Sequence, residues 1–209
     1  MNLDLTQLIA IAAALGWASG LRLYAVVFLT GLAGALRWVQ LPGDLHVLST
    51  PIVLGASGGM LVLEFFVDKI PGLDSVWDAI HTFVRIPAGA ALAGAVFGGD
   101  PAGWVTAAAL MGGTLAATSH AAKLTTRASA NTSPEPFSNV ALSLLGDSAV
   151  PVMLWLSWVH PVVALVVLAV LAVVSLVVVW VLWRFIARFI RRMRGGYGPS
   201  MELPNGGLR

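Results

Sequence analysis

Long apolar stretches without any Asp, Glu, Lys or Arg recur along the chain. They cover residues 5–21, 45–63, 101–122 and 148–183. A helix needs about 20 residues to cross ~30 Å of hydrocarbon, so several of these stretches are long enough to span a membrane. No segment alternates apolar and polar residues as strands do, which argues against a membrane β-barrel. The pattern predicts an all-α, polytopic bundle of transmembrane helices.

The breaks between the apolar stretches predict about six spans. The first lies between Asp4 and Arg37, which is too long for one perpendicular crossing at about 1.5 Å per residue. Because Gly16, Gly20 and Arg22 interrupt it, we expect a broken or strongly tilted helix. Three further spans are expected over residues 50–68, 74–97 and 101–128. A polar, proline-containing segment over 131–139 precedes the last two, which we expect to end near residues 158 and 190.

Composition agrees with one membrane domain. Hydrophobic residues make up 58% of the chain and charged residues 11%, whereas a soluble domain carries roughly 25% charged residues. The mean hydropathy is +0.87. We therefore expect a single transmembrane domain over residues 1–194, followed by a flexible cytoplasmic tail over residues 195–209.

Arginines are concentrated directly after the last apolar stretch. Basic residues favour the cytoplasmic side, so this cluster predicts a cytoplasmic C-terminus and an anchor for anionic membrane lipids rather than for nucleic acid. An even number of spans would place the N-terminus on the same side, in a bacterial-type inner membrane. The cluster consists of Arg184, Arg188, Arg191, Arg192 and Arg194.

The two halves of the chain resemble each other weakly. Residues 15–22 and 115–123 are both small-residue stretches that lead to a base, and residues 67–71 and 146–151 both place an acid shortly before a proline. Halves over residues 1–99 and 100–194 with three spans each would face opposite ways in the bilayer. Such a 3+3 inverted repeat is typical of secondary transporters.

Two glycine pairs are spaced for close helix contact. Gly55 and Gly59 share one helix face, as do Gly94 and Gly98. This spacing lets two helix backbones approach each other in a membrane. It therefore makes a homo-oligomer formed through these faces possible.

Three acids in or near the spans are candidates for proton or sodium coupling. Glu64 and Asp68 lie four residues apart on one helix face, where two carboxylates repel unless a cation or proton lies between them. Asp147 follows a glycine inside an apolar helix and needs a partner, for which Arg22 or Lys123 would serve. The alternatives are that Asp68 only ends a helix among the headgroups and that Asp147 forms a structural buried ion pair.

A polar stripe begins the third predicted span. Asp74, Asp78, His81 and Arg85 are spaced to face the same way along a helix. Such a stripe would line a water-filled path through the protein. Alternatively, the segment lies at the membrane surface with this stripe in water and its apolar residues in lipid.

The strongest candidate for binding a ligand surrounds the polar segment over 131–139. Two bases precede this segment, and we expect a helix to start near Ser138. The free N–H groups and positive dipole at such a helix start would favour binding of a phosphate or carboxylate. The alternative is an ordinary basic cytoplasmic loop. With the deep base of the first span, the candidate substrate-binding residues are Arg22, Lys123, Arg127, Ser133, Ser138 and Asn139.

Familiar enzyme and metal signatures are missing from the sequence. The chain has no cysteine, and its four histidines share no ligand spacing, so we expect neither a metal site nor a cofactor. No hydrolase or nucleotide-binding signature occurs either. The sequence therefore favours a protein without enzymatic activity, and an enzyme remains an alternative hypothesis.

Several segments resemble the bacterial membrane family catalogued as domain of unknown function 4126. They cover residues 18–22, 64–71, 118–127 and 133–139, and the resemblance extends over roughly residues 5–190. It implies a compact multi-span protein of the inner membrane. It assigns no activity to any residue.

These observations favour a small transporter or lipid-translocating protein for an anionic substrate or headgroup. Coupling to protons or sodium would involve Asp147, Asp68 and Glu64. A second hypothesis is a non-transporting assembly factor that binds other membrane proteins through its glycine faces. A third is an enzyme acting on a lipid headgroup, with Asp147 or Glu64 as general base.

Overall fold

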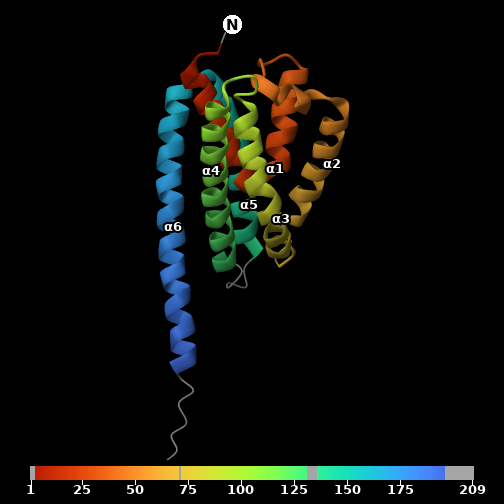
Figure 1. Cartoon of the computed structure of the whole chain (residues 1–209). Helices are drawn as coiled ribbons and strands as arrows, with labels where there is room; N and C mark the ends of the chain where they lie inside the picture. The colour runs from red at the N-terminus through yellow and green to blue at the C-terminus, as the bar shows by residue number, and fades with distance from the viewer. Residues whose placement is uncertain (1–2, 71, 131–135, 196–209) are drawn as a thin grey trace, which may run out of the picture.

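The chain folds into a bundle of long helices with one short 3-10 helix (Figure 1). The computed structural model describes residues 3–70, 72–130 and 136–195, and all of their side chains except those of residues 136–139, 186, 187 and 189–195. No strand occurs among these residues. The elements are α1 (Leu5–Ala35), η1 (Gly43–Ser49), α2 (Pro51–Val67), α3 (Leu73–Ala95), α4 (Ala102–Ala130), α5 (Pro136–Val159) and α6 (Pro161–Gly195).

Local sequence explains where these helices begin and end. Asp4 and Gln7 form a capping box at the start of α1, in which the Asp4 carboxylate accepts from the Gln7 amide at 2.7 Å. Pro51 occupies the first turn of α2, where its missing N–H is not needed. The turns before α3 and α4 contain Gly72 and Gly99, whose φ angles of 86° and 90° favour glycine.

The polar segment before α5 differs in part from its prediction. α5 begins at Pro136, so Ser138 lies inside the first helical turn rather than at the predicted cap. A proline is well suited to this first position because it lacks the N–H that a helix start leaves unpaired. Ser133 and the predicted tail over residues 196–209 lie outside the described residues.

Helix α1 is a hairpin that turns back at Arg22. This residue has φ −147° and ψ 83°, which breaks the helix into a first arm over residues 5–21 and a second arm over residues 23–35. Both arms reach the same end of the bundle in Figure 1. Leu8 of the first arm accordingly lines the same pocket as Gln40, which follows the second arm. The first predicted span is thus a broken helix, the first of the two expected alternatives, and its second arm returns to the end at which the first arm begins.

The first arm of this hairpin forms the centre of the core. Ala10 to Gly20 are all buried, and small residues let α3 and α4 approach closely. A Cβ atom added at Gly16 would overlap the backbone of Gly112 in α4, and one at Gly20 would overlap the carbonyl of Ala116. The second arm packs on α2, where Phe28 covers Gly58 at 3.1 Å from the position of an added Cβ.

Within the described part of the chain, three helices are long and apolar enough to cross a membrane, and a fourth span is added if a bent pair of helices counts as one. The three are Leu5–Ala35, Val140–Val159 and Pro161–Phe185, and the bent pair joins Gly43–Ser49 to Pro51–Val67 at 72°. α1 passes this test by length and composition although it turns back at Arg22. α3 and α4 do not pass it, and both contain charged residues along one side.

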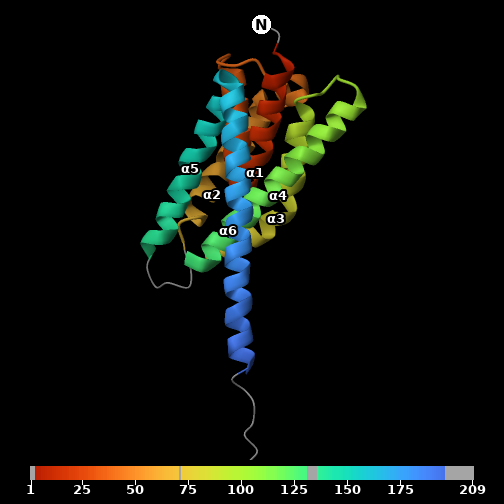
Figure 2. The same ribbon diagram turned by 90° about the vertical axis from the view of Figure 1, so that its left-hand side faces the viewer.

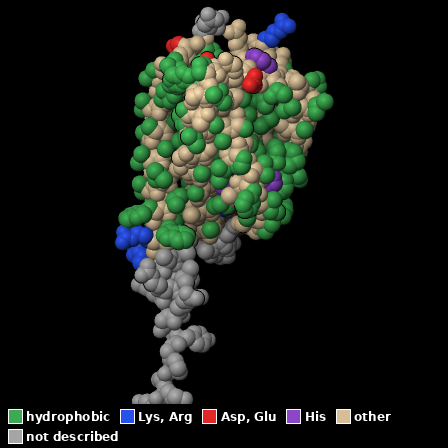
Figure 3. Space-filling model, in the orientation of Figure 1, with side chains coloured by type: hydrophobic (Ala, Val, Ile, Leu, Met, Phe, Trp, Pro, Cys, Tyr) green, Lys and Arg blue, Asp and Glu red, His purple; other side chains and the backbone are tan. Residues whose placement is uncertain are grey.

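The outer surface of the bundle is mainly apolar. On the face shown in Figure 3, Lys, Arg, Asp and Glu side chains appear only toward the two ends. Large side chains such as Ile52, Phe83 and Trp183 are exposed along the sides. The start of α1 and the end of α6 lie at opposite ends of the bundle (Figure 1), whereas we expected both termini on one side. The difference arises because α1 turns back.

The two glycine pairs have different environments. Gly94 faces Val105 and Ala109 of α4, and Gly98 faces Asp44 of η1, so this pair is used for packing within the chain. Added Cβ atoms at Gly55 and Gly59 would meet no described atom within 4 Å. The Gly55 face of α2 therefore points away from the described part of the bundle.

Candidate functional site

The hairpin tip at Arg22 is held by side chains of α4. A helix break leaves backbone carbonyls without their usual helical partners, and buried carbonyls need donors. Lys123 donates to the carbonyl of Leu21 at 3.0 Å, and His120 lies 3.1 Å from the carbonyl of Gly20. These contacts fix the tip against α4 and bring the Arg22 side chain into the interior.

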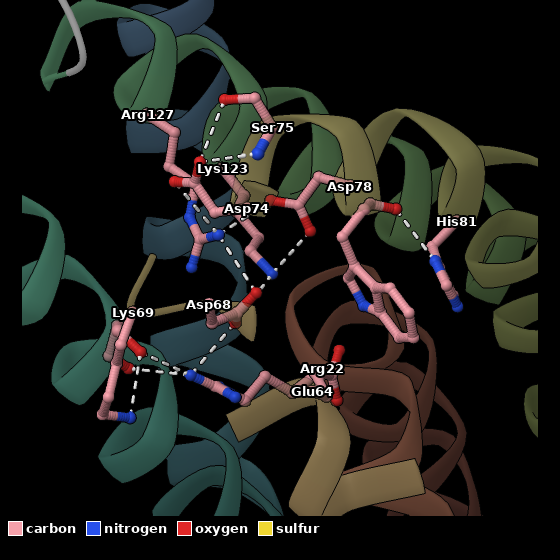
Figure 4. A network of polar contacts seen from close by, with 12 residues as sticks. Arg22, Glu64, Asp68, Lys69, Asp74, Ser75, Asp78, His81, Lys123 and Arg127 are labelled. Atoms are coloured by element: carbon pink, nitrogen blue, oxygen red, sulfur yellow. Dashed lines mark hydrogen bonds and ion pairs between the residues drawn. The ribbon is translucent and has the colours of Figure 1, made fainter. Parts of the chain in front are cut away.

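Asp68 is the meeting point of three bases at this tip. Its carboxylate lies 3.1 Å from Arg22, 3.3 Å from Lys123 and 3.0 Å from Arg127. The side chain of Asp68 is 0% exposed, so its charge depends entirely on these partners. α1, α2 and α4 are thereby joined through a single carboxylate (Figure 4).

A second carboxylate, Asp78, extends the cluster into α3. It lies 2.6 Å from Arg85, 2.9 Å from Lys123 and 3.2 Å from Arg127. Arg85 also pairs with Glu64 at 2.6 Å, and both of these side chains are 0% exposed. Lys123 and Arg127 therefore bridge Asp68 and Asp78, which repel each other less because two bases lie between them.

Asp147 closes the cluster on the side of α5. It lies 2.9 Å from Arg22 and 3.5 Å from Lys69. The side chains of Asp147 and Lys69 are 22% and 24% exposed, so this end of the cluster reaches solvent or lipid while the rest does not. Arg22 also donates to the hydroxyl of Ser143 at 2.8 Å.

The cluster as a whole is electrically balanced. Among the described residues it contains five acids and five bases, which we call the charge network. Balanced pairing is what allows so many ionisable groups to be buried in an apolar bundle, because removing one partner of such a pair costs about 3–5 kcal/mol. The members are Glu64, Asp68, Asp74, Asp78 and Asp147, with Arg22, Lys69, Arg85, Lys123 and Arg127.

A cavity of about 350 Å³ lies beside the hairpin tip, and we call it the tip cavity. It is enclosed by α1, α4, α5 and α6, and most of its wall is apolar. Among the described residues, its lining contains three bases, Arg22, Lys123 and Arg127, and one acid, Asp68. The other acids of the network are not among the described lining residues, although several of them pair with these three bases.

Two buried N–H donors belong to side chains that line the tip cavity. The Nη1 of Arg22 and the indole Nε1 of Trp17 have no hydrogen-bond partner among the described residues. Arg22 is 1% exposed and Trp17 is 4% exposed. An unpaired buried donor costs about 1–3 kcal/mol, so an acceptor that reached either group from the cavity would stabilise it.

The structure brings most of the predicted site residues together. Arg22, Lys123 and Arg127 line one cavity, as the anion hypothesis requires, and Asp68 joins them. The predicted pairing of Asp147 with Arg22 is also present. Ser133 lies outside the described residues, and Ser138 and Asn139 belong to α5 without described side chains.

Glu64 and Asp68 do not share one cation between them. Glu64 pairs with Arg85 and Asp68 with three other bases, so neither depends on a proton or sodium ion to offset the other. No group of three His, Asp or Glu side chains that could hold a metal ion occurs among the described residues.

The polar stripe of α3 faces the interior. Asp74, Asp78 and Arg85 are 0% exposed and His81 is 7% exposed, which rules out the surface helix with its stripe in water. His81 contacts the hydroxyl of Tyr24 at 3.2 Å and stacks on Trp77. The helical spacing of the stripe was the signal that could have identified Asp78 and Arg85 as part of the site.

Two contributors to the site were not predicted from sequence. Trp17 and Ser143 each carry one hydrogen-bonding group and lie within apolar helices. Their spacing in the sequence does not mark them as site residues. Ser143 contacts the Arg22 guanidinium, and Trp17 lines the same cavity as both of them. Lys69 also joins the network through Asp147, and nothing in its sequence position beside Asp68 indicated this pairing.

Comparison with known families agrees with the resemblance seen in the sequence. Residues 9–184 match the family described as Domain of unknown function (DUF4126), and the chain belongs to this family. No curated protein and no solved structure matches the chain. The description of this family assigns no activity to its members.

Proposed function

We propose that the protein is a small transporter or lipid-translocating protein of a bacterial-type inner membrane, which handles an anionic substrate or headgroup in the tip cavity. The observation that carries this proposal is the pair of unpartnered donors, Arg22 Nη1 and Trp17 Nε1, on side chains that line a cavity with three bases and one acid. Re-entrant segments and broken helices are typical places for transporter binding sites.

The depth of the tip cavity supports this proposal. Leu171 of α6 lines the cavity about ten residues after Pro161 and about nine before Trp180. At about 1.5 Å per residue, Pro161 and Trp180 are ~29 Å apart, which is close to the thickness of the hydrocarbon layer. If α6 crosses between them, Leu171 lies near the middle of the bilayer.

We further propose a topology in which α2 to α6 each cross the membrane and α1 enters and leaves from one side. This replaces the six crossings expected from sequence, while α1 still fills the place of a span. The arginines of α6 put its end in the cytoplasm, so both ends of α1 face the opposite side. In this topology the charges of α3 and α4 are shielded from lipid by the charge network.

In this topology the proposed repeat relates the three elements α1 to α3 to the three elements α4 to α6, although α1 does not cross the membrane. The acids of the two acid-proline motifs, Asp68 and Asp147, both pair with Arg22. The bases of the two small-residue stretches, Arg22 and Lys123, both pair with Asp68. Residues that the sequence echo relates thus meet in one network.

Proton or sodium coupling is best supported at Asp147. Its side chain is 22% exposed, whereas those of Asp68 and Glu64 are 0% exposed and held by strong pairs. A proton or cation could reach Asp147 without first entering the interior. Release of Arg22 from Asp147 would then change the position of the guanidinium at the tip cavity.

Reconstitution into proteoliposomes tests the proposed transport. Two probes are followed in separate assays, labelled phosphatidylglycerol moving between leaflets and labelled inorganic phosphate entering the lumen. Ala149→Phe fills the wall of the tip cavity and is expected to reduce movement to the protein-free rate. Val152→Phe lies on the exposed side of the same helix and should leave it unchanged. Movement of neither probe by the natural protein contradicts the proposal.

The assembly-factor hypothesis is favoured by one separate observation. Gly55 and Gly59 share an open helix face with the exposed side chains of Ile52, Val62 and Phe66. A partner helix could pack closely against such a face. Gly59→Leu would then reduce co-purification with a stoichiometric partner or second copy, and it would leave movement of both probes unchanged.

A further inference from the structure

We infer that the tip cavity holds an anionic lipid, whose headgroup accepts hydrogen bonds from Arg22 and Trp17 and whose hydrocarbon lies along the apolar wall. This inference rests on the proposed function, because it names the substrate class of the same cavity. It commits to a lipid rather than to a free aqueous anion.

The unpaired N–H donors of Arg22 and Trp17 mark the part of the cavity where the lipid headgroup would bind. Arg22 Nη1 carries positive charge and Trp17 Nε1 is a neutral donor, and both are buried without partners among the described residues. Neither group can accept a hydrogen bond, so their ligand must offer acceptors. A phosphate or carboxylate oxygen is a suitable acceptor for either donor, and the bases Lys123 and Arg127 line the same cavity.

The wall of the cavity defines the hydrocarbon end. Leu142, Leu145 and Ala149 of α5 and Leu171 of α6 line it, and Leu145 is also 66% exposed on the outer surface of the bundle. A lining residue that is also on the outer surface places the mouth of the cavity on the side that faces lipid. In Figure 2, α5 and α6 lie close together at one end of the bundle and diverge toward the other.

The surface near the end of α6 would supply such a lipid. Arg184 stacks over Trp180 at 4.6 Å, and both Arg184 and Arg188 are exposed. Interfacial Trp and Arg attract anionic lipids, each base contributing about 1 kcal/mol. A free aqueous anion would have to lose its hydration to pass an apolar mouth that opens toward hydrocarbon, which is unfavourable.

Lipid titration followed by native mass spectrometry tests the inference on the full-length protein in detergent. The probes are phosphatidylglycerol, phosphatidylcholine with the same chains, and inorganic phosphate. We expect phosphatidylglycerol to bind most tightly. Trp17→Phe should weaken it about tenfold or more, because a hydrogen bond to a charged group is lost. Trp104→Phe changes a half-exposed indole away from the cavity and should leave affinity unchanged.

Each remaining outcome is decisive. Equal affinity for the two lipids, binding of inorganic phosphate alone, or identical affinities of Trp17→Phe and the natural protein would overturn the inference. Arg22→Lys keeps the positive charge but removes the planar set of guanidinium N–H donors. It should also weaken phosphatidylglycerol binding. Should Trp17→Phe fail to fold, Ala149→Phe supplies the test, since filling the wall should abolish binding.

Binding and movement separate this inference from the proposed function. Tight phosphatidylglycerol binding without movement of either probe in proteoliposomes supports the lipid site and contradicts transport. Uptake of inorganic phosphate without lipid binding supports transport and overturns the lipid site.

Discussion

Arg22 of α1 and Asp147 of α5 form a 2.9 Å ion pair at the tip of the α1 hairpin. The pair joins the buried part of the charge network to its exposed edge, because Arg22 is 1% exposed whereas the Asp147 side chain is 22% exposed. The same guanidinium lines the tip cavity. Stability and ligand binding are thereby linked through one side chain.

The two basic partners of Asp147 should differ sharply in their contribution to stability. Arg22→Met removes a buried partner from both Asp68 and Asp147 and should reduce stability by about 3–5 kcal/mol. Lys69→Met removes a partly exposed one and should cost less than about 1 kcal/mol. Thermal unfolding in detergent measures both. Equal losses would show that Arg22 is not buried in the network.

Charge balance predicts that a double substitution is milder than a single one. Arg85→Met leaves Glu64 buried without its base, at a cost of about 3–5 kcal/mol. Adding Glu64→Leu removes that orphaned charge, and Asp78 still has Lys123 and Arg127. The double variant should therefore unfold at a higher temperature than Arg85→Met. If it unfolds at a lower temperature, the two side chains do not pair.

Two glycine substitutions compare the core of the bundle with its surface. Gly16→Ala places a methyl group against the backbone of Gly112, so the first arm of α1 must move, at about 1–3 kcal/mol. Gly55→Ala places the same group in open space and removes backbone freedom from the unfolded chain, so it should be neutral or slightly stabilising. Thermal unfolding of the two variants in one detergent would reveal the difference.

Coupling at Asp147 predicts a specific loss. In proteoliposomes with an imposed pH gradient, Asp147→Asn should still move substrate but should no longer respond to the gradient. The amide keeps a hydrogen-bond acceptor for Arg22 while losing the titrating group. A response as large as that of the natural protein would remove Asp147 from the coupling mechanism and leave Asp68 and Glu64 as candidates.

Much of the fold follows from local signals in the sequence. Charges, prolines and glycines mark the ends of α2, α3 and α4 close to their observed bounds, because each of these residues has a local conformational or solvation preference. The course of α1 could not be predicted in the same way. A single residue, Arg22, decides between a bend and a complete turn, and its conformation depends on donors supplied by α4.

The charge network was predictable in its members but not in its connections. An apolar chain must pair its deep charges, which led to the expectation that Asp147 meets Arg22 or Lys123. The stripe that contains Asp78 and Arg85 was equally compatible with a surface helix, because spacing alone does not say what a helix face contacts. No sequence pattern indicated that Trp17 belongs to the site, because the cavity that it lines forms only where α1 turns back.

The account depends most directly on α1 turning back at Arg22. The chain has no cysteine, so single cysteines can be labelled with a membrane-impermeant thiol reagent in intact and permeabilised vesicles. Thr6→Cys and Trp38→Cys, at exposed positions before and after the hairpin tip, should react from the same side of the membrane. Ile70→Cys should react from the other side. Labelling of Thr6→Cys and Trp38→Cys from opposite sides would mean that α1 crosses the membrane, and this result would contradict the tip cavity and the function proposed for it.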